Sequence, residues 1–198
     1  MAQSVLGWSL LVYLVAAIPM GVVVGRLRGV DIRGAGSGNI GATNATRVLG
    51  AKWGVAVFFL DFLKAYLPLR LAMASCALGG LPDPAPALAW VGLAATLGHV
   101  FPVYLGFRGG KGVAVALGVF AALLPASGLL AALLYVQTLA LTRVSAIGSL
   151  TAVSAATLHI LIIDAPPAYK WLVIAIAALI WIRHRGNLRQ LRQRREPN

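Results

Sequence analysis

Long apolar runs recur along the whole chain of 198 residues, with short polar or glycine-rich segments between them. A helix that crosses a bilayer upright needs about 20 mostly apolar residues. The candidate spans are residues 6–24, 55–77, 88–105, 113–124, 129–141, 147–163 and 169–182. The two runs on either side of Pro125 to Gly128 are short. The pattern therefore predicts an all-α polytopic membrane protein with about seven transmembrane helices, in which residues 113–141 form either two short spans or a re-entrant pair.

Composition agrees with this pattern. Hydrophobic residues make up 60% of the chain and charged residues 11%, compared with about 25% charged in soluble proteins. The apolar runs leave no block of sequence that resembles a soluble domain. We therefore expect one transmembrane domain over residues 1–198, with a basic tail at 183–198.

The positive charge predicts an orientation. The net charge is +12, and no Lys or Arg precedes the first apolar run, whereas Arg26, Arg28 and Arg33 follow it. Cytoplasmic loops of membrane proteins are enriched in Lys and Arg. The N-terminus is therefore expected outside, and the segments 26–52, 106–112, the one around Arg143 and the C-terminal tail are expected in the cytoplasm.

Two opposite charges fall inside the second apolar run. Asp61 and Lys64 are three residues apart, so a helix brings them onto one face. An unpaired charge inside a membrane is costly. The spacing predicts an ion pair, and a functional role for it stays open.

The first predicted cytoplasmic loop is suited to bind an anion. Residues 33–47 combine Gly36, Gly38 and Gly41 with hydroxyl and amide side chains, and end on Arg47. Glycines let backbone N–H groups converge on a phosphate, and Arg can grip it with two donors. The glycines also fit a dinucleotide-binding spacing, but no strand precedes them, so that fold is not supported.

Two further segments on the same side carry similar chemistry. Residues 98–112 end on Gly109, Gly110, Lys111 and Gly112, which predicts a second phosphate site with a point charge at a helix start. In this segment His99 is either a base or a structural residue. Residues 183–187 place His184 and Asn187 beside arginines, which a plain basic tail does not explain.

Carboxylates are almost missing from the predicted cytoplasmic side. Asp31 stands alone in the loops and Glu196 lies near the C-terminus. Metal-dependent phosphotransferases and hydrolases need clustered Asp, Glu or His ligands, so no metal site is predicted. Several predicted phosphate-binding segments without a metal site indicate a protein that binds more than one phosphate group. They also favour transfer of a group other than phosphoryl.

The three segments resemble the motifs of a known family, the bacterial membrane glycerol-3-phosphate acyltransferases that use acyl phosphate as donor. Residues 37–47 resemble its first motif, 98–112 its second and 184–187 its third, in that order. The resemblance implies seven membrane helices in the bacterial inner membrane, with the active site on the cytoplasmic side. It also implies transfer of a fatty acyl group to the 1-hydroxyl of sn-glycerol 3-phosphate. The products would be lysophosphatidic acid and phosphate, at the start of phospholipid synthesis.

The resemblance also implies roles for individual residues. The glycerol-3-phosphate site would comprise Arg47, Lys111, Ser149, His184 and Asn187. The acyl-phosphate site would comprise Ser37, Gly38, Asn39, Gly41, Thr43, Asn44, Gly109 and Gly110. The catalytic residues would be Lys111, Ser37, Arg47, His184 and Asn187. Between Arg143 and Ser149 the chain departs from the family pattern, and Ser145 is a possible substitute for Ser149.

The resemblance implies no cofactor and no nucleic-acid partner. The expected partners are the two small substrates and membrane lipid, with a soluble enzyme that produces acyl phosphate as a further candidate. Neither His99 nor His184 is followed five positions later by Asp, so no histidine–carboxylate pair of the soluble acyltransferase type is present. We hypothesise that the phosphate of the donor takes the hydroxyl proton while His184 mainly binds.

A different class of protein fits part of the pattern. A transporter for a phosphorylated metabolite would also use cationic glycine-rich loops. However, the chain has no obvious inverted repeat, and its cationic motifs lie on one side instead of at the midplane. A membrane scaffold would explain basic helix ends but not three motif-rich loops.

Overall fold

The computed structural model describes residues 2–79 and 82–193, and the regular elements within them are all helical. In chain order they are α1 (Ala2–Ala17), α2 (Met20–Leu27), η1 (Ile32–Gly34), α3 (Ala42–Leu49), α4 (Ala51–Leu78), α5 (Ala85–Val100), η2 (Val103–Leu105), α6 (Val113–Leu123), α7 (Pro125–Thr142), α8 (Ser145–Ile162) and α9 (Pro167–Gln193).

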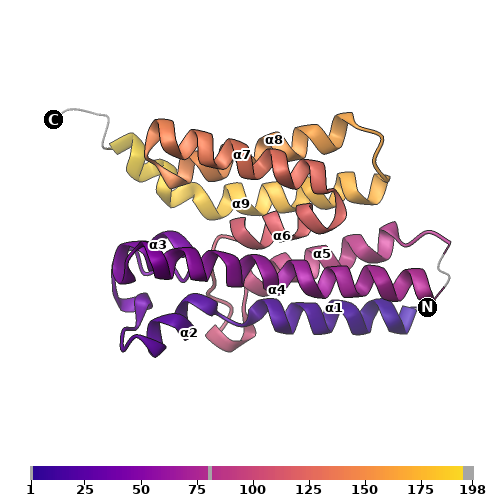
Figure 1. The fold of residues 1–198 in the computed structure, drawn as a ribbon, viewed down its shortest axis with the longest axis horizontal. Coiled ribbons are helices and arrows are strands. Elements are labelled where there is room, and N and C mark those ends of the chain that lie inside the picture. The colour runs from indigo at the N-terminus through magenta and orange to yellow at the C-terminus, as the bar shows by residue number, and fades with distance from the viewer. Residues whose placement is uncertain (1, 80–81, 194–198) are drawn as a thin grey trace.

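The long helices run roughly parallel to one axis in two layers (Figure 1). One layer holds α1, α4 and α5, the other holds α7, α8 and α9, and α6 lies between them. The short helices α2 and α3 gather at one end of the first layer. Within the layers α1 packs mainly on α5 and α7 on α8, while α4 packs on α6 and α9 contacts both α5 and α8.

Several helices are long enough to cross a membrane, and their exposed surface is apolar. Among the described residues, four helical segments are long and apolar enough to cross a membrane: Val5–Leu27, Ala85–Leu105, Pro125–Thr142 and Ser145–Ile162. All seven predicted apolar runs lie on helices. Large apolar side chains such as Leu6, Leu133 and Trp171 are more than half exposed, as expected where lipid replaces water. The predicted all-α membrane fold is therefore confirmed.

The first predicted span is not one continuous helix. It breaks at Ile18 and Pro19, because proline has no N–H to continue the ladder. The N–H of Val22 donates to the carbonyl of Pro19, which leaves the Ile18 carbonyl without a helical donor. Lys64 Nζ on α4 supplies that donor at 2.7 Å.

The predicted ion pair inside the membrane is present. Lys64 Nζ lies 2.8 Å from Asp61 Oδ1, and both side chains are 2% exposed. Lys64 therefore neutralises a buried carboxylate and caps a broken helix at once. The pair holds α4 against the break between α1 and α2.

The two short runs around Pro125 form a tight helical hairpin. Helix α6 ends at Leu123 and Pro125 begins α7. Gly128 lies so close to Ala121 that a Cβ there would be 2.7 Å from the Ala121 Cα. At 11 residues, α6 is about 16 Å long, roughly half of a hydrocarbon core. The loop that precedes α6 is therefore drawn inward from the end of the bundle.

Replacing Lys64 tests the dual role of this lysine. Lys64→Met leaves Asp61 buried without its counter-ion and the Ile18 carbonyl without its donor, so we expect a loss of about 3–5 kcal/mol in the free energy of unfolding. Thermal or denaturant unfolding in detergent micelles measures the loss. Lys52→Met, at the exposed start of the same helix, is the matched control, and equal stability of the two variants would contradict the interpretation.

Candidate functional site

A cavity of about 490 Å³ opens between the two layers. Residues from α3 to α9 line it, together with the loop before α3 and the segment before α6. One part of the wall is polar and cationic, and the rest is apolar. The cavity therefore joins two chemically different compartments.

The first motif is shaped by Asn44, which is 2% exposed. Its Oδ1 accepts a hydrogen bond from the N–H of Ser37 at 2.8 Å. Its Nδ2 donates to the carbonyls of Ile32 and Ala35 at 3.0 and 3.1 Å. Gly36 adopts a φ of 60° and lies against the Asn44 amide, where a Cβ would be 2.3 Å from Oδ1. Asn44 thus fixes the loop internally.

Residues 33–47 were predicted to be a loop, and this prediction is only partly right. The segment includes the end of η1 and most of α3, whose first residues follow the N-cap Gly41. Ala45 and Asn44 are the buried face of that short helix. The helix was missed because eight residues are too few for a periodic pattern to be distinguished from a loop.

Most predicted residues of the first motif reach the cavity wall. Asn39 Oδ1 accepts from the N–H of Gly41 at 2.9 Å, and both line the cavity. Gly38, with a φ of 69°, lies outside the lining. The residues of this motif at the cavity are Ser37, Asn39, Gly41, Thr43, Asn44 and Arg47.

The second and third motifs meet across the cavity. Lys111 Nζ donates to Asn187 Oδ1 on α9 at 2.5 Å. Burial lowers the pKa of Lys111, and the positive charges of Arg183 and Arg47 lower it further. Arg47 also lines the cavity, so two cationic side chains from distant segments share one space.

His184 lies one turn before Asn187 on the same face of α9 and is 2% exposed. Its Nδ1 is 2.8 Å from the carbonyl of Ile180, which assigns the proton to Nδ1 and leaves Nε2 as an acceptor. Burial lowers the pKa of His184, the bond to Ile180 opposes this, and the charge of Lys111 lowers it further. A neutral imidazole at the cavity wall is therefore the expected state at pH 7.

Ser149 and Ser145 both line the cavity but bond differently. Ser149 Oγ donates to the carbonyl of Ser145 at 2.8 Å, one turn earlier on α8. Ser145 Oγ lies 2.9 Å from Thr43 Oγ1 and 3.1 Å from the hydroxyl of Tyr135. Ser145, at the start of α8, thereby joins the first motif to α7. Tyr135 was not predicted, because its contact with Ser145 depends on how α7 packs against α8.

His99 on α5 and Asp61 on α4 are buried polar residues of the cavity wall. They are 3% and 1% exposed, and His99 Nδ1 lies 3.6 Å from Asp61 Oδ1. The imidazole packs against Gly110, where a Cβ would be 2.1 Å from Nε2. Gly109 and Gly110 do not line the cavity, so their lack of side chains serves close packing on α5.

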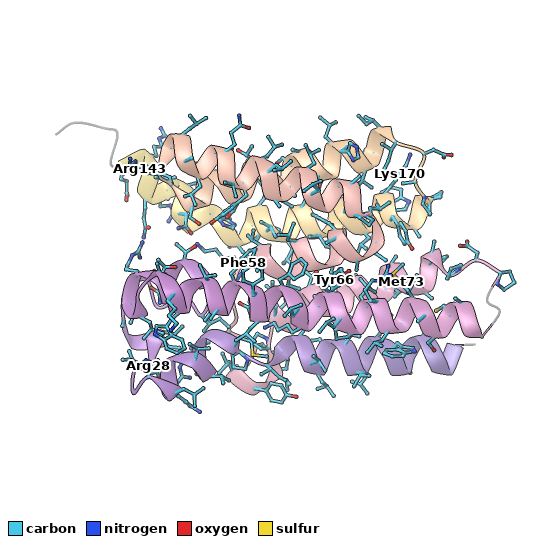
Figure 2. All side chains as sticks on the ribbon, viewed as in Figure 1. Arg28, Phe58, Tyr66, Met73, Arg143 and Lys170 are labelled. Atoms are coloured by element: carbon cyan, nitrogen blue, oxygen red, sulfur yellow. The ribbon has the colours of Figure 1, made fainter. Side chains whose placement is uncertain are left out.

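Apolar side chains complete the wall, from Phe58 and Phe62 on α4 to Leu117 and Phe120 on α6. Figure 2 shows Phe58 at the border of α4 with the second layer. Phe59 and Val136 line the cavity and are also 54% and 64% exposed on the outer surface. The apolar compartment thus reaches the surface that faces lipid between α4 and α7.

Groups that could hold a metal do not gather here. Among the described residues, no three His, Cys, Asp or Glu side chains lie close enough together to bind an ion. Asp31 is paired with Arg33 at 2.6 Å, and this hydrogen-bonded guanidinium lowers the pKa of the carboxyl to about 2. Asp31 therefore stays ionised in a pair away from the cavity lining.

Comparison with known proteins gives a consistent result. A family model described as glycerol-3-phosphate acyltransferase matches residues 6–194. The glycerol-3-phosphate acyltransferase of Aquifex aeolicus (strain VF5) is 44% identical over 184 residues, 93% of each chain. That of Myxococcus xanthus (strain DK1622) is 48% identical over 188 residues, 94% of this chain and 95% of the relative.

Solved structures agree over nearly the whole chain. The glycerol 3-phosphate form of PlsY (YgiH), described as an integral membrane glycerol 3-phosphate acyltransferase, has a TM-score of 0.89 and 42% identity to this chain. Its lysophosphatidic acid form has a TM-score of 0.87 and 41% identity. Each match covers 98% of this chain and 95% of that chain.

The internal role of Asn44 can be tested without any ligand. Asn44→Ala removes a buried amide and leaves the N–H of Ser37 and the carbonyls of Ile32 and Ala35 without their partner, at a cost of about 1–3 kcal/mol. We expect faster hydrogen–deuterium exchange in a peptide covering residues 35–41. Asn39→Ala, which removes a single bond in the same loop, is the control. Unchanged exchange in Asn44→Ala would show that the loop is held by something else.

Proposed function

Because the chain belongs to the glycerol-3-phosphate acyltransferase family, we propose that it moves a fatty acyl group from acyl phosphate to the 1-hydroxyl of sn-glycerol 3-phosphate. The products are lysophosphatidic acid and inorganic phosphate. The observation that carries this proposal is one cavity with a cationic compartment and an apolar compartment. Two phosphates suit the first, and a fatty acyl chain suits the second.

The cationic compartment supports a reaction between two anions. Two phosphate groups together carry up to about four negative charges near neutral pH, and their repulsion must be offset. Arg47 and Lys111 both line the space, and Ser37 and Asn39 add a hydroxyl and an amide to its lining. We assign glycerol 3-phosphate to Arg47, Lys111, Ser149, His184 and Asn187. The head of acyl phosphate is assigned to Ser37, Asn39, Gly41 and Thr43, with Gly38, Asn44, Gly109 and Gly110 shaping the backbone around it.

The transfer needs the two substrates to be positioned and does not need a nucleophile from the protein. Acyl phosphate is a mixed anhydride with a good leaving group. The 1-hydroxyl oxygen forms a bond to the acyl carbon, the bond from that carbon to the phosphate oxygen breaks, and phosphate leaves with the electron pair. Holding both substrates in one cavity can contribute on the order of 7–11 kcal/mol to lowering the barrier.

The hydroxyl proton has a natural acceptor in the leaving phosphate. His184 has its Nδ1 proton committed to Ile180, and its Nε2 is available to accept a hydrogen bond from the acceptor substrate. Asp61 is buried and already ion-paired with Lys64. We therefore assign proton uptake to the donor's phosphate and binding to His184.

The proposal includes a topology. We assign seven crossings of the bacterial inner membrane to α1, α4 and α5 to α9, with the N-terminus outside and the active site in the cytoplasm. Successive long helices alternate in direction, and α1 begins at the end opposite to that at which α9 stops (Figure 1). Arg28 and Arg143 lie at one end and Lys170 at the other (Figure 2). The end with the motifs would also receive acyl phosphate from a soluble producing enzyme.

The activity itself is tested with purified protein in lipid vesicles, palmitoyl phosphate and labelled glycerol 3-phosphate. We expect labelled lysophosphatidic acid and phosphate in a 1:1 ratio. Accumulation of label inside the vesicles without product would favour a transporter. Product from acyl-CoA or acyl carrier protein, with none from acyl phosphate, would contradict the proposed donor.

Lys111→Ala tests the acceptor site. Loss of a charged donor to phosphate costs about 1.5–3 kcal/mol, so KM for glycerol 3-phosphate should rise roughly 10- to 100-fold. Steady-state kinetics with each substrate varied measures this change. Arg108→Ala, an exposed cation in the same segment but outside the cavity lining, is the control. A KM equal to that of the control would remove Lys111 from the site.

His184→Ala separates binding from proton transfer. We expect weaker binding of glycerol 3-phosphate and a single-turnover rate at saturation within about tenfold of the unmodified protein, because only a binding contact is lost. Rapid-quench measurement of acyl transfer at saturating substrate gives that rate. Abolished transfer with unchanged binding would instead identify His184 as the base.

A further inference from the structure

Arg183 makes contacts that a charge at a membrane boundary does not require. It precedes His184 on α9, is half-buried and does not line the cavity. Its Nη2 donates to the carbonyl of Gly109 at 2.9 Å, and its Nε donates to the carbonyl of Gly110 at 3.3 Å. One planar guanidinium thus holds two successive carbonyls, which the single head of a lysine cannot reproduce in the same geometry.

The same two glycines are held from the opposite side by α5. The N–H of Gly109 donates to the carbonyl of Val100, and the N–H of Gly110 donates to the carbonyl of His99, both at 3.1 Å. The His99 ring covers Gly110 so closely that no side chain fits there. Both N–H groups of Gly109 and Gly110 therefore donate to α5, and both of their carbonyl groups accept from Arg183.

The clamped pair leads directly into Lys111. The side chain of Lys111 ends on Asn187 Oδ1, four residues after Arg183 on α9. Residues four apart in a helix lie on one face, so Arg183 and Asn187 hold the start and the end of the Gly109–Lys111 segment from a single surface. The position of the ammonium group depends on both.

We propose that Arg183 is a positioning residue, which sets the ammonium of Lys111 against the phosphate of the acceptor substrate without touching that substrate. The inference rests on the proposed function, since it takes glycerol 3-phosphate as the ligand of Lys111. From the charge pattern alone, Arg183 is one of the basic tail residues that indicate the orientation in the membrane. The proposal gives this arginine a role in the substrate site as well.

Arg183 also acts on the charge state of Lys111. Burial lowers the pKa of the Lys111 ammonium first, followed by the charges of Arg183 and of Arg47. His184 is the other titratable group beside it, and the charge of Lys111 lowers the pKa of that imidazole in turn. Removing the charge of Arg183 raises the pKa of Lys111, so the loss of binding at alkaline pH moves to higher pH.

The test compares Arg183→Gln and Arg183→Lys with Arg189→Gln, an exposed arginine farther along the same helix. For Arg183→Gln we expect KM for glycerol 3-phosphate to rise on the order of tenfold, with KM for acyl phosphate within about twofold of the unmodified protein. Arg183→Lys keeps the positive charge but loses the two guanidinium donors to Gly109 and Gly110. It should therefore show most of the rise in KM for glycerol 3-phosphate, while the pH at which binding is lost stays unchanged. Arg189→Gln should match the unmodified protein in both.

Several outcomes would overturn the inference. Unchanged KM for glycerol 3-phosphate in a folded Arg183→Gln would do so. Equal rises in KM for both substrates, accompanied by a lowered midpoint of thermal unfolding, would also do so, because they indicate a structural role only. If Arg183→Gln does not fold, Arg183→Lys decides by the same ratio of the two KM values. An unmodified protein that makes no lysophosphatidic acid would refute the proposed function and would be recognised before any variant is compared.

Discussion

The short helix α6 is the constraint on which the rest of the site depends. It is half the length of a spanning helix, yet α4, α5, α7 and α8 all pack against it. Because it is short, the segment carrying Lys111 begins well inside the bundle instead of at its end (Figure 1). A polar segment at that depth must satisfy its backbone internally, and His99, Val100 and Arg183 do this for Gly109 and Gly110.

This depth explains how polar and apolar chemistry meet in one cavity. The first motif approaches from the end of the bundle through α3, and α9 brings His184 and Asn187 from the other layer. Apolar side chains of α4, α6 and α7 complete the wall, and two of them, Phe59 and Val136, are also exposed on the outer surface. A substrate with an ionic head and a hydrocarbon chain can occupy such a space with its chain near the bilayer. Membership of the glycerol-3-phosphate acyltransferase family agrees with that shape.

Much of this was predictable from local signals. The apolar runs predicted an all-helical membrane fold because lipid-facing and buried positions are both apolar, and the spacing of Asp61 and Lys64 predicted their ion pair. The break at Pro19 and its partner Lys64 were not foreseen, because they depend on a contact between distant segments. The same reason hid the link from Ser145 to Thr43 and Tyr135. Motif patterns identified Asn44 but not its function within the loop.

In the proposed mechanism both substrates occupy one cavity at the same time, and the acyl group passes directly between them. Exchange of labelled phosphate into acyl phosphate, measured without glycerol 3-phosphate, tests this claim most directly. A direct transfer predicts no exchange, because phosphate leaves only when the acceptor attacks, together with intersecting lines when both substrates are varied. Rapid exchange without the acceptor would show an acyl-enzyme intermediate and contradict the account.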